Sequence, residues 1–405
     1  MTAASMEIDT LSQYQSEDSM RSVVQAGRAG LLNADEVYRL AVTLANSGNK
    51  LTWEYEEQTA DLVSTGGPSS LSTLLVPLYL RSLGFVVPKL GVPGRPAGGI
   101  DVLAQLPGYR TRVLMDEIKA IITKCGYVHF LAGEEFAPLD AKFFSYRQKQ
   151  GAQNIPSLVS ASLLAKKIAC GIKSVGVDVR VASHGNFGRS YAEAKEAFKT
   201  FFDAAAIGGI KATGILTDGR FPYQPYIGRG ESLAALKKIF AGQAHGTLAD
   251  HRDLCRLMAG HVAHIGGVAP SEITENGIEA IFYEHIVAQG SSVDAFERKV
   301  ESILTAHNHE VRAKDRGFLS VDLASLRGIF RRVHSNRQVT PNEFADSFGV
   351  ILCARPGSYL NRGDLLATVR ASTSDWEMIS ACLENTIRCV ELLDAAPGTD
   401  EVIYG

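Results

Sequence analysis

The chain has 405 residues, of which 45% are hydrophobic and 21% are charged, and its formal net charge at pH 7 is −3. This composition is typical of a globular protein with two or three domains. No run of 18 apolar residues occurs, which argues against a membrane-spanning helix. The lack of a long basic tract argues against a nucleic-acid partner, so we expect small-molecule chemistry or protein contact.

Features associated with secretion are missing from the sequence. The first 20 or so residues are polar and acidic, lack the apolar stretch of a signal peptide, and are expected to be frayed. The six cysteines form no Cys-x-x-Cys pair, and we expect them to be reduced thiols of a cytoplasmic protein. They are Cys125, Cys170, Cys255, Cys353, Cys382 and Cys389.

The first third of the chain predicts helices followed by a strand and a glycine turn. Apolar residues recur at helical spacing between Met20 and Ala45, which predicts two short amphipathic helices. The segment 61–67 (DLVSTGG) and the long apolar run after it predict a strand, a turn and a buried helix. Residues 91–101 contain four glycines and two prolines, which predicts a loop.

The middle of the chain alternates between helical and extended patterns. Residues 155–172 predict a helix, 175–182 a strand, 190–205 a helix and 210–216 another strand. Such alternation is typical of an α/β sheet with crossover helices.

The last part of the chain predicts a different arrangement. Residues 231–305 predict helices. After residue 306, short strand patterns with turn signals and a helix over 374–393 predict a small α+β domain.

The sharpest local motif is Ser64-Thr65-Gly66-Gly67, which is followed by several hydroxyl residues including Thr73. Glycines let a ligand approach the backbone closely, and N–H groups with hydroxyls at a helix start bind anions. A plain glycine-serine turn with a helix cap is the simpler interpretation of the motif alone, because it lacks the spacing of a nucleotide-binding fingerprint.

A second group consists of Arg147, Ser162 and Lys166. The last two are four residues apart on a predicted helix, so a hydroxyl and an ammonium converge on one side of it. A solvated cationic face is the simpler interpretation of these residues taken alone.

The ten histidines are scattered along the chain and do not predict a metal site. His261 and His264 share a helix face, but they have no acidic partner at a metal-ligand spacing. His184 follows a predicted strand, a place where α/β proteins often carry functional loops.

Taken in order, these segments resemble the thymidine and pyrimidine-nucleoside phosphorylase family over nearly the whole chain. The Lys-His-Ser-Thr-Gly-Gly motif of that family corresponds to Leu62-Val63-Ser64-Thr65-Gly66-Gly67. Further matching segments are Ser47-Gly48, Leu51-Thr52-Trp53, Gly98-Gly99-Ile100-Asp101, Leu106-Pro107-Gly108-Tyr109, Ala137-Pro138-Leu139-Asp140 with Arg147, Ile155-Pro156, Ser162-Leu163-Leu164-Ala165-Lys166-Lys167, Asp178-Val179-Arg180-Val181, Leu216-Thr217-Asp218, and Arg337 with Asp346-Ser347-Phe348-Gly349-Val350.

The resemblance implies an α/β fold with an all-helical lobe, an α/β lobe containing a mixed sheet, and a small C-terminal α+β domain. The cleft between the lobes would bind a pyrimidine base on the helical side and phosphate on the α/β side. The implied boundaries are 1–48 and 137–172 for the helical lobe, 49–136 and 173–305 for the α/β lobe, and 306–405 for the C-terminal domain.

The resemblance also assigns roles to single residues. Arg147, Ser162 and Lys166 would bind the base edge, which reverses the simpler interpretation given above. The residues implied for phosphate or another anion are Ser64, Thr65, Gly66, Gly67 and Thr73.

The sequence departs from the family at the phosphate motif. Leu62 stands where the family has a phosphate-binding lysine, and Val63 where it has a histidine that is often assigned as proton donor to the base. The next glycine-rich loop is about two residues shorter and has Gly99 near a threonine position. Lys89 and Arg95, in or near that loop, are candidates for compensating charge, and no catalytic residue is assigned.

These observations predict an enzyme of the pentosyltransferase class with a degenerate phosphate site, acting on the N-glycosidic bond of a pyrimidine or modified nucleoside. The alternatives are the same scaffold with another nucleophile or substrate, for example nucleoside hydrolysis, and a non-catalytic nucleoside binder. We expect a nucleoside or pyrimidine base as ligand, no metal and no cofactor, inorganic phosphate as candidate co-substrate, and no membrane or nucleic-acid partner. The resemblance implies a cytoplasmic homodimer formed through the helical lobe.

Overall fold

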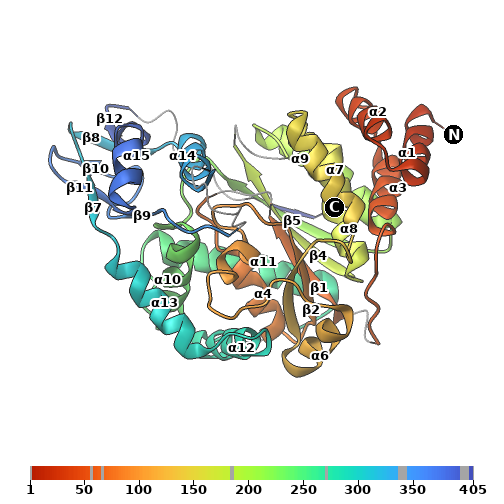
Figure 1. The fold of residues 1–405 in the computed structure, drawn as a ribbon, viewed down its shortest axis with the longest axis horizontal. Coiled ribbons are helices and arrows are strands. Elements are labelled where there is room, and N and C mark those ends of the chain that lie inside the picture. The colour runs from red at the N-terminus through yellow and green to blue at the C-terminus, as the bar shows by residue number, and fades with distance from the viewer. Residues whose placement is uncertain are drawn as a thin grey trace.

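The computed structural model describes residues 2–54, 58–64, 68–182, 187–269, 272–335, 344–392 and 401–404. Figure 1 shows a central sheet with helices around it, a helical group near the N-terminus and a separate group of short strands at the opposite end. Within the described part of the chain, every helix is too short or too polar to cross a lipid bilayer.

Three helices occupy the N-terminal segment, one more than the sequence predicted. α2 (Glu17–Arg28) and α3 (Ala34–Ala45) are the two expected amphipathic helices. The expectation that the first 20 residues are frayed was wrong, because α1 (Ala3–Tyr14) buries Ile8 and Leu11 against its neighbours. Residue Thr2 caps α1 and also donates to Glu36 in α3, over 2.7 Å. These apolar and polar contacts with α2 and α3 hold α1 in an ordered helix.

The central sheet is mixed. Its parallel strands are β1 (Ala60–Ser64), β4 (Ser174–Val181) and β5 (Lys211–Asp218), and β13 (Glu401–Tyr404) pairs antiparallel with β5. β4 is buried along its whole length and β5 at every residue but the first. Burial of this extent is typical of parallel strands that are covered on both faces.

A second parallel pair lies beside β1. β2 (Val87–Gly91) pairs with β3 (Tyr127–Leu131), and the bridge between Thr59 and Val86 connects this pair to the start of β1. Because all these strands run in the same direction, the carboxyl ends of β1 and β2 reach one edge of the sheet, where ligands bind in α/β folds.

Helices cover both faces of the sheet. On one face, α4 (Ser72–Ser82) packs against β1, and α11 (Thr247–Gly266) packs against α4, β4 and β5. On the other face, α9 (Tyr191–Ile207) packs against β4 and β5. α3 and α8 (Pro156–Ala169) pack against α9 and form a second layer. The remaining helices of this region are α5 (Gly99–Leu103), α6 (Met115–Cys125), α7 (Pro138–Lys149), α10 (Arg229–Phe240), α12 (Glu275–Ala288) and α13 (Val293–Thr305).

The C-terminal part has its own buried apolar cluster, which includes Leu319, Leu326, Phe330 and Phe348. It contains two small antiparallel sheets and two helices, as the predicted α+β domain requires. Its elements are β7 (His309–Arg312), β8 (Gly317–Val321), α14 (Leu323–Ser335), β9 (Gly349–Leu352), β10 (Tyr359–Leu360), β11 (Leu365–Arg370), α15 (Thr373–Thr386) and β12 (Ile387–Val390), with β6 (Tyr226–Ile227) added at one edge.

The last helix is shorter than predicted. α15 ends at Thr386 because the next four residues form β12, which pairs with β8. The α/β fold with a mixed sheet and a C-terminal α+β part is confirmed. The predicted domain boundaries stay a prediction.

A buried ionic network joins α10 to the C-terminal part. Glu231 of α10 accepts two hydrogen bonds from Arg370, of 2.7 and 2.9 Å, and contacts Nε2 of His307 at 3.0 Å. Arg370 also donates to Asp346 over 2.8 Å. Burial by itself would raise the pKa of Glu231, but Arg370 and His307 hold that pKa down at about 2.

Replacing one partner of this network should destabilise the protein. In Glu231→Gln the charge of Arg370 keeps only Asp346 as a partner, so we expect the free energy of unfolding to fall by about 3 kcal/mol. Urea denaturation measures this change, and Lys199→Ala in an exposed pair with Asp203 is the matched control. An equal effect of both substitutions would contradict the role of the network.

The lowered pKa of Glu231 in this network also predicts that the stability of the protein depends on pH. The native pKa of Glu231 lies below its ordinary value of 4.5, so the stabilisation is complete above that pH and is lost as the pH falls toward about 2. The stability difference between the wild type and Glu231→Gln should therefore shrink over this range.

Candidate functional site

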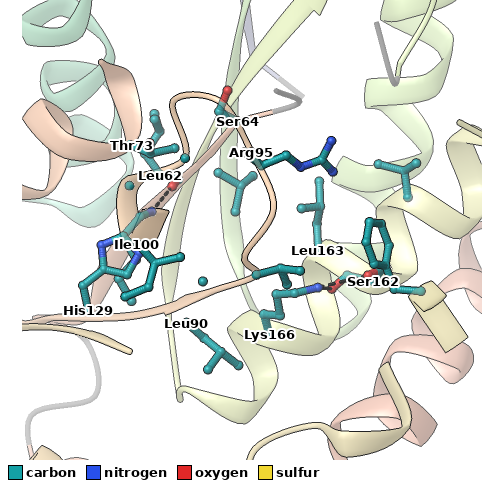
Figure 2. A pocket seen from close by; sticks show the side chains of 18 of the residues that line it. Leu62, Ser64, Thr73, Leu90, Arg95, Ile100, His129, Ser162, Leu163 and Lys166 are labelled. Carbon is teal, nitrogen blue, oxygen red and sulfur yellow. Dashed lines mark hydrogen bonds between the residues drawn. The ribbon is translucent and has the colours of Figure 1, made fainter. Parts of the chain in front are cut away.

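One cavity collects the predicted site residues that the structure describes. It lies between α7 and α8 on one side and the ends of β1, β2 and β3 on the other (Figure 2). The predicted residues that line it are Ser64, Thr73, Lys89, Arg95, Arg147, Ser162 and Lys166. Thr65, Gly66 and Gly67 of the glycine motif lie outside the described residues, as do His184 and Arg337.

Ser162 and Lys166 form one rigid unit on α8. Proline at the first position of this helix starts it, and the spacing of four residues brings the two side chains together. Lys166 Nζ donates to the hydroxyl of Ser162 over 3.0 Å, to the carbonyl of Ser162 over 2.8 Å, and to Asp140. All three ammonium protons are therefore used within the protein. The hydroxyl of Ser162 accepts from Lys166, so its own proton is available to a ligand.

Two nitrogen atoms of Arg147 lack acceptors in the described part of the chain although the residue is buried. Its side chain on α7 is 1% exposed, and Nε and Nη1 have no hydrogen-bond partner among the described residues. The guanidinium packs on Phe143 and Phe144, with Cζ 5.3 and 5.6 Å from the ring centroids. Burial lowers the pKa of Arg147 to about 10, so it stays charged at neutral pH. A buried charged donor without an acceptor is costly, and it marks a place for a ligand oxygen.

A buried carboxylate under the cavity binds two lysines. Asp61 of β1 accepts from Lys89 of β2 over 2.7 Å and from Lys167 of α8. Lys89 also donates to the backbone carbonyl of Leu62. Burial by itself would raise the pKa of Asp61, but the two ammonium groups hold it below its ordinary value. Lys89 thus brings a positive charge to the backbone of Leu62, the residue that replaces the family lysine.

The hydroxyls at the end of β1 have different surroundings. Ser64 donates to Asp178 over 3.1 Å, and Asp178 also binds Ser72 and Arg180. Thr73 lines the cavity, and its hydroxyl makes no hydrogen bond to any described residue. Thr73 is therefore the freer of the two predicted anion contacts.

The guanidinium of Arg95 faces the helical side of the cavity. Figure 2 shows it extending toward Leu163 and away from His129 and Thr73, and Cζ lies 5.8 Å from the ring centroid of Phe144. The backbone of Arg95 is held on both sides, since Asp101 accepts from its N–H and Arg229 donates to its carbonyl. The predicted loop 91–101 is confirmed between the end of β2 at Gly91 and the start of α5 at Gly99, while its last residues form the start of α5.

His129 is a cavity residue that sequence reasoning missed. It lies on β3 opposite Lys89 in the register of β2 and β3, and it is 1% exposed. Among the described residues its Nδ1 is the only hydrogen-bond partner of the Tyr127 hydroxyl, at 3.2 Å, and when this hydroxyl donates to Nδ1 the ring proton is on Nε2. Burial, and then Lys89, lower the pKa of His129 well below its ordinary value, so the imidazole is neutral. In the sequence, the one indication of its role was a histidine among the largely apolar residues of β3 (YVHFL).

Gly99 makes room for this imidazole. A Cβ at Gly99 would lie 2.5 Å from Cε1 of His129 and 2.9 Å from the carbonyl oxygen of Thr73. A threonine, which the family has near this position, would not fit beside His129. The histidine and the glycine therefore form one packing arrangement.

The cavity wall carries more positive than negative charge. Six cationic side chains line it, and the carboxylates paired with them are Asp61, Asp140 and Asp178. No acidic residue lines the cavity in the described part of the chain, where no group of three or more His, Cys, Asp or Glu is placed to hold a metal ion. The surplus charge favours an anionic ligand. The six cations are Lys89, Lys166, Lys167, Arg95, Arg147 and Arg180.

Removing the cation beside Leu62 should weaken anion binding. In Lys89→Met, Asp61 keeps Lys167 as a partner, so we expect the fold to persist while the affinity for inorganic phosphate falls at least about tenfold. Calorimetric titration with phosphate measures this, with Lys124→Met on the exposed side of α6 as control. Unchanged affinity would show that Lys89 only compensates the charge of Asp61 and does not contribute to phosphate binding.

Comparison with known proteins identifies a relative that aligns with most of the chain. A pyrimidine-nucleoside phosphorylase from Geobacillus stearothermophilus is 22% identical over 371 residues, which cover 88% of this chain and 85% of the relative. No family model matches the chain.

Two solved structures are also similar. The anthranilate phosphoribosyltransferase of Thermus thermophilus has a TM-score of 0.49 and 18% identity, over 74% of this chain and 99% of that one. The enzyme of the same name from Saccharomyces cerevisiae, in complex with PRPP and Mg, has a TM-score of 0.48 and 12% identity, over 75% and 92%. The resemblance to the pyrimidine-nucleoside phosphorylases that the ordered motifs indicated is thus confirmed, with the curated relative aligned along most of both chains.

Proposed function

We propose that this protein transfers a pentosyl group between a pyrimidine-type base and phosphate, by cleaving or forming the N-glycosidic bond of a nucleoside. The observation that carries the proposal is Arg147, a buried guanidinium that has no acceptor among the described residues and lies with Ser162 on the wall of a cationic cavity. The relative's name, pyrimidine-nucleoside phosphorylase, supports the same class of reaction.

The helical side of the cavity is suited to a flat base with carbonyl oxygens. Arg147 offers a planar set of N–H donors, and Ser162 offers a hydroxyl proton. Lys166 acts through Ser162, because its protons are already bound. When the glycosidic bond breaks, negative charge develops on the base oxygens, and fixed donors of this kind stabilise it.

The opposite side is suited to phosphate. Lys89 supplies positive charge, and Thr73 and the Nε2–H of His129 supply hydrogen-bond donors. His129 is neutral and stands on a different strand from Val63, so it does not restore the lost proton donor at that position. It contributes as a hydrogen-bond donor to an anion.

The reaction balances without a protein acid. An oxygen of hydrogenphosphate bonds to the anomeric carbon while the carbon–nitrogen bond to the base breaks and its electron pair leaves with the base. The proton of hydrogenphosphate is transferred to the departing base, which is released as a neutral molecule. The second product is the pentose 1-phosphate. Arg147 and Ser162 bind the departing base during this step.

Turnover should be slow with ordinary substrates. A missing general acid costs roughly 10²–10⁴-fold in rate, and a typical enzyme turns over about 10 times per second. The motif 62–67 retains the hydroxyls and glycines of the family but not its lysine and histidine. We infer a weakened phosphate site in which Lys89 replaces part of the lost charge.

A panel assay tests the proposal. Purified protein is incubated with thymidine, uridine and their deoxy or ribo counterparts, with and without phosphate, and free base and pentose 1-phosphate are measured. Slow, phosphate-dependent release of base supports the proposal. Release without phosphate would favour hydrolysis on the same scaffold, and tight binding without turnover would favour a non-catalytic binder.

The base side has its own test. Ser162→Ala removes one hydroxyl donor, so we expect about a tenfold loss of affinity for a pyrimidine base or nucleoside without a change in fold. Lys166→Ala should weaken binding further, because it also leaves Asp140 without its ammonium partner. Calorimetry measures both affinities, and Ser145→Ala on the exposed side of α7 is the control. Equal affinities in all variants would exclude the assigned base site.

Two expectations follow from the resemblance and belong to this proposal. We infer a homodimer formed through the helical lobe, and a cytoplasmic location. Sedimentation of the purified protein and imaging of a tagged full-length chain measure them.

A further inference from the structure

Two arginines on the helical side of the cavity have more charge and more donors than a neutral base can use. Two nitrogen atoms of the buried Arg147 lack acceptors among the described residues, and Arg95 and Arg147 both lie near the ring of Phe144. Their Cζ atoms are 5.8 Å (Arg95) and 5.6 Å (Arg147) from the ring centroid of Phe144. Both guanidinium groups lie near the ring of Phe144 and their like charges repel each other, so an anion bound beside them would relieve this repulsion.

The nearby carboxylates are already paired with other cations. Asp140 binds Lys166, and Asp101 binds Arg229 over 2.7 Å as well as two backbone N–H groups of the loop. Among the described residues, neither Arg95 nor Arg147 forms a salt bridge. Asp101 attracts Arg95 and Asp140 attracts Arg147 at longer range, but in the described part of the chain neither carboxylate forms a salt bridge with them.

Further positive charge comes from α14 of the C-terminal part. Arg327 and Arg331 are four residues apart on this helix, so they share one of its faces. Burial lowers the pKa of Arg327 to about 10, and the neighbouring charges of Arg95 and Arg331 contribute to this lowering. Burial also lowers the pKa of Arg95, and Arg331 adds to the effect. Within the described part, none of these arginines forms a salt bridge with a carboxylate.

We propose that the nucleoside bound in this cavity carries an anionic group, a phosphomonoester or a carboxylate, which Arg95 and Arg147 bind beside Phe144. The inference rests on the proposed function, because it specifies the substrate of the same site. One carbonyl oxygen cannot satisfy both guanidinium groups, whereas an oxyanion offers two or three acceptors and neutralises charge. Arg327 adds long-range attraction from the C-terminal part.

This anion is distinct from the phosphate co-substrate of the proposed reaction. Phosphate is assigned to the side formed by Lys89, Thr73 and His129. Figure 2 shows the Arg95 guanidinium directed to the other side, toward Leu163 of α8. This distribution of charge fits a nucleoside whose anionic group faces Arg95 and Arg147 and whose pentose lies between that group and the phosphate co-substrate.

The test compares neutral and anionic ligands on the full-length protein at saturating inorganic phosphate. Uridine is the neutral ligand, uridine 5′-monophosphate carries a phosphomonoester, and a pyrimidine nucleoside with a carboxylated base carries a carboxylate. Calorimetry measures affinity, and release of base measures turnover. We expect one of the anionic ligands to bind about tenfold to a hundredfold more tightly than uridine, and the ligand that does so identifies the group.

Variants then locate the effect. Arg95→Gln lies on a loop and is half-buried, so we expect the fold to persist, which a thermal melt checks. It should reduce the affinity for the anionic ligand at least about fivefold more than that for uridine. Arg327→Gln should act in the same direction with a smaller effect. Arg298→Gln on the exposed side of α13 removes the same charge far from the loop and should change neither affinity.

The outcomes separate the two proposals. Equal affinity and turnover for uridine and both anionic ligands would overturn the anionic-substrate inference and leave pentosyl transfer intact. A preference for an anionic ligand that survives in Arg95→Gln would also overturn it, because the anion would then bind elsewhere. Failure of every ligand to bind or react would overturn the proposed function together with this inference.

Discussion

Asp61 is a fully buried carboxylate that binds lysines from two layers of the fold, Lys89 on β2 and Lys167 on α8. A buried carboxylate is stable only when its charge is compensated, so the sheet and the helical layer must meet where these lysines reach it. The cavity lies at this junction. The junction also carries one more positive than negative charge, which sets the sign of the ligand that the cavity favours.

The excess positive charge increases from this junction toward the helical side. Lys166 and Asp140 balance each other, but Arg147 and Arg95 have no carboxylate of their own among the described residues. Buried arginines usually complete their hydrogen bonds within the protein. Here the donors of Arg147 that have no acceptor in the described part of the chain line a cavity, and we propose that an oxygen-rich ligand supplies the missing acceptors.

The loss of the family lysine and histidine at Leu62 and Val63 is accompanied by charged and polar groups on neighbouring strands. Lys89 donates to the backbone of Leu62, and His129 lies opposite Lys89 on β3. We propose that the lysine replaces charge and that the neutral imidazole replaces a donor. Neither replaces an acid next to the base, which explains why we expect a slow reaction in which substrate charge contributes to binding.

The sequence by itself determined the α/β class, most helices and strands, and the segments that carry Arg147, Ser162 and Lys166, because these follow from periodicity, glycine turns and ordered motifs. It missed α1, which is ordered by packing on α2 and α3, and it extended α15 over residues that pair with β8. Only the tertiary structure decided that Lys89 binds Asp61, that Arg95 faces Phe144, and that His129 enters the cavity. These contacts join residues that are far apart in the chain, and their free energies depend on burial and on charges from other elements, which no local pattern of residues records.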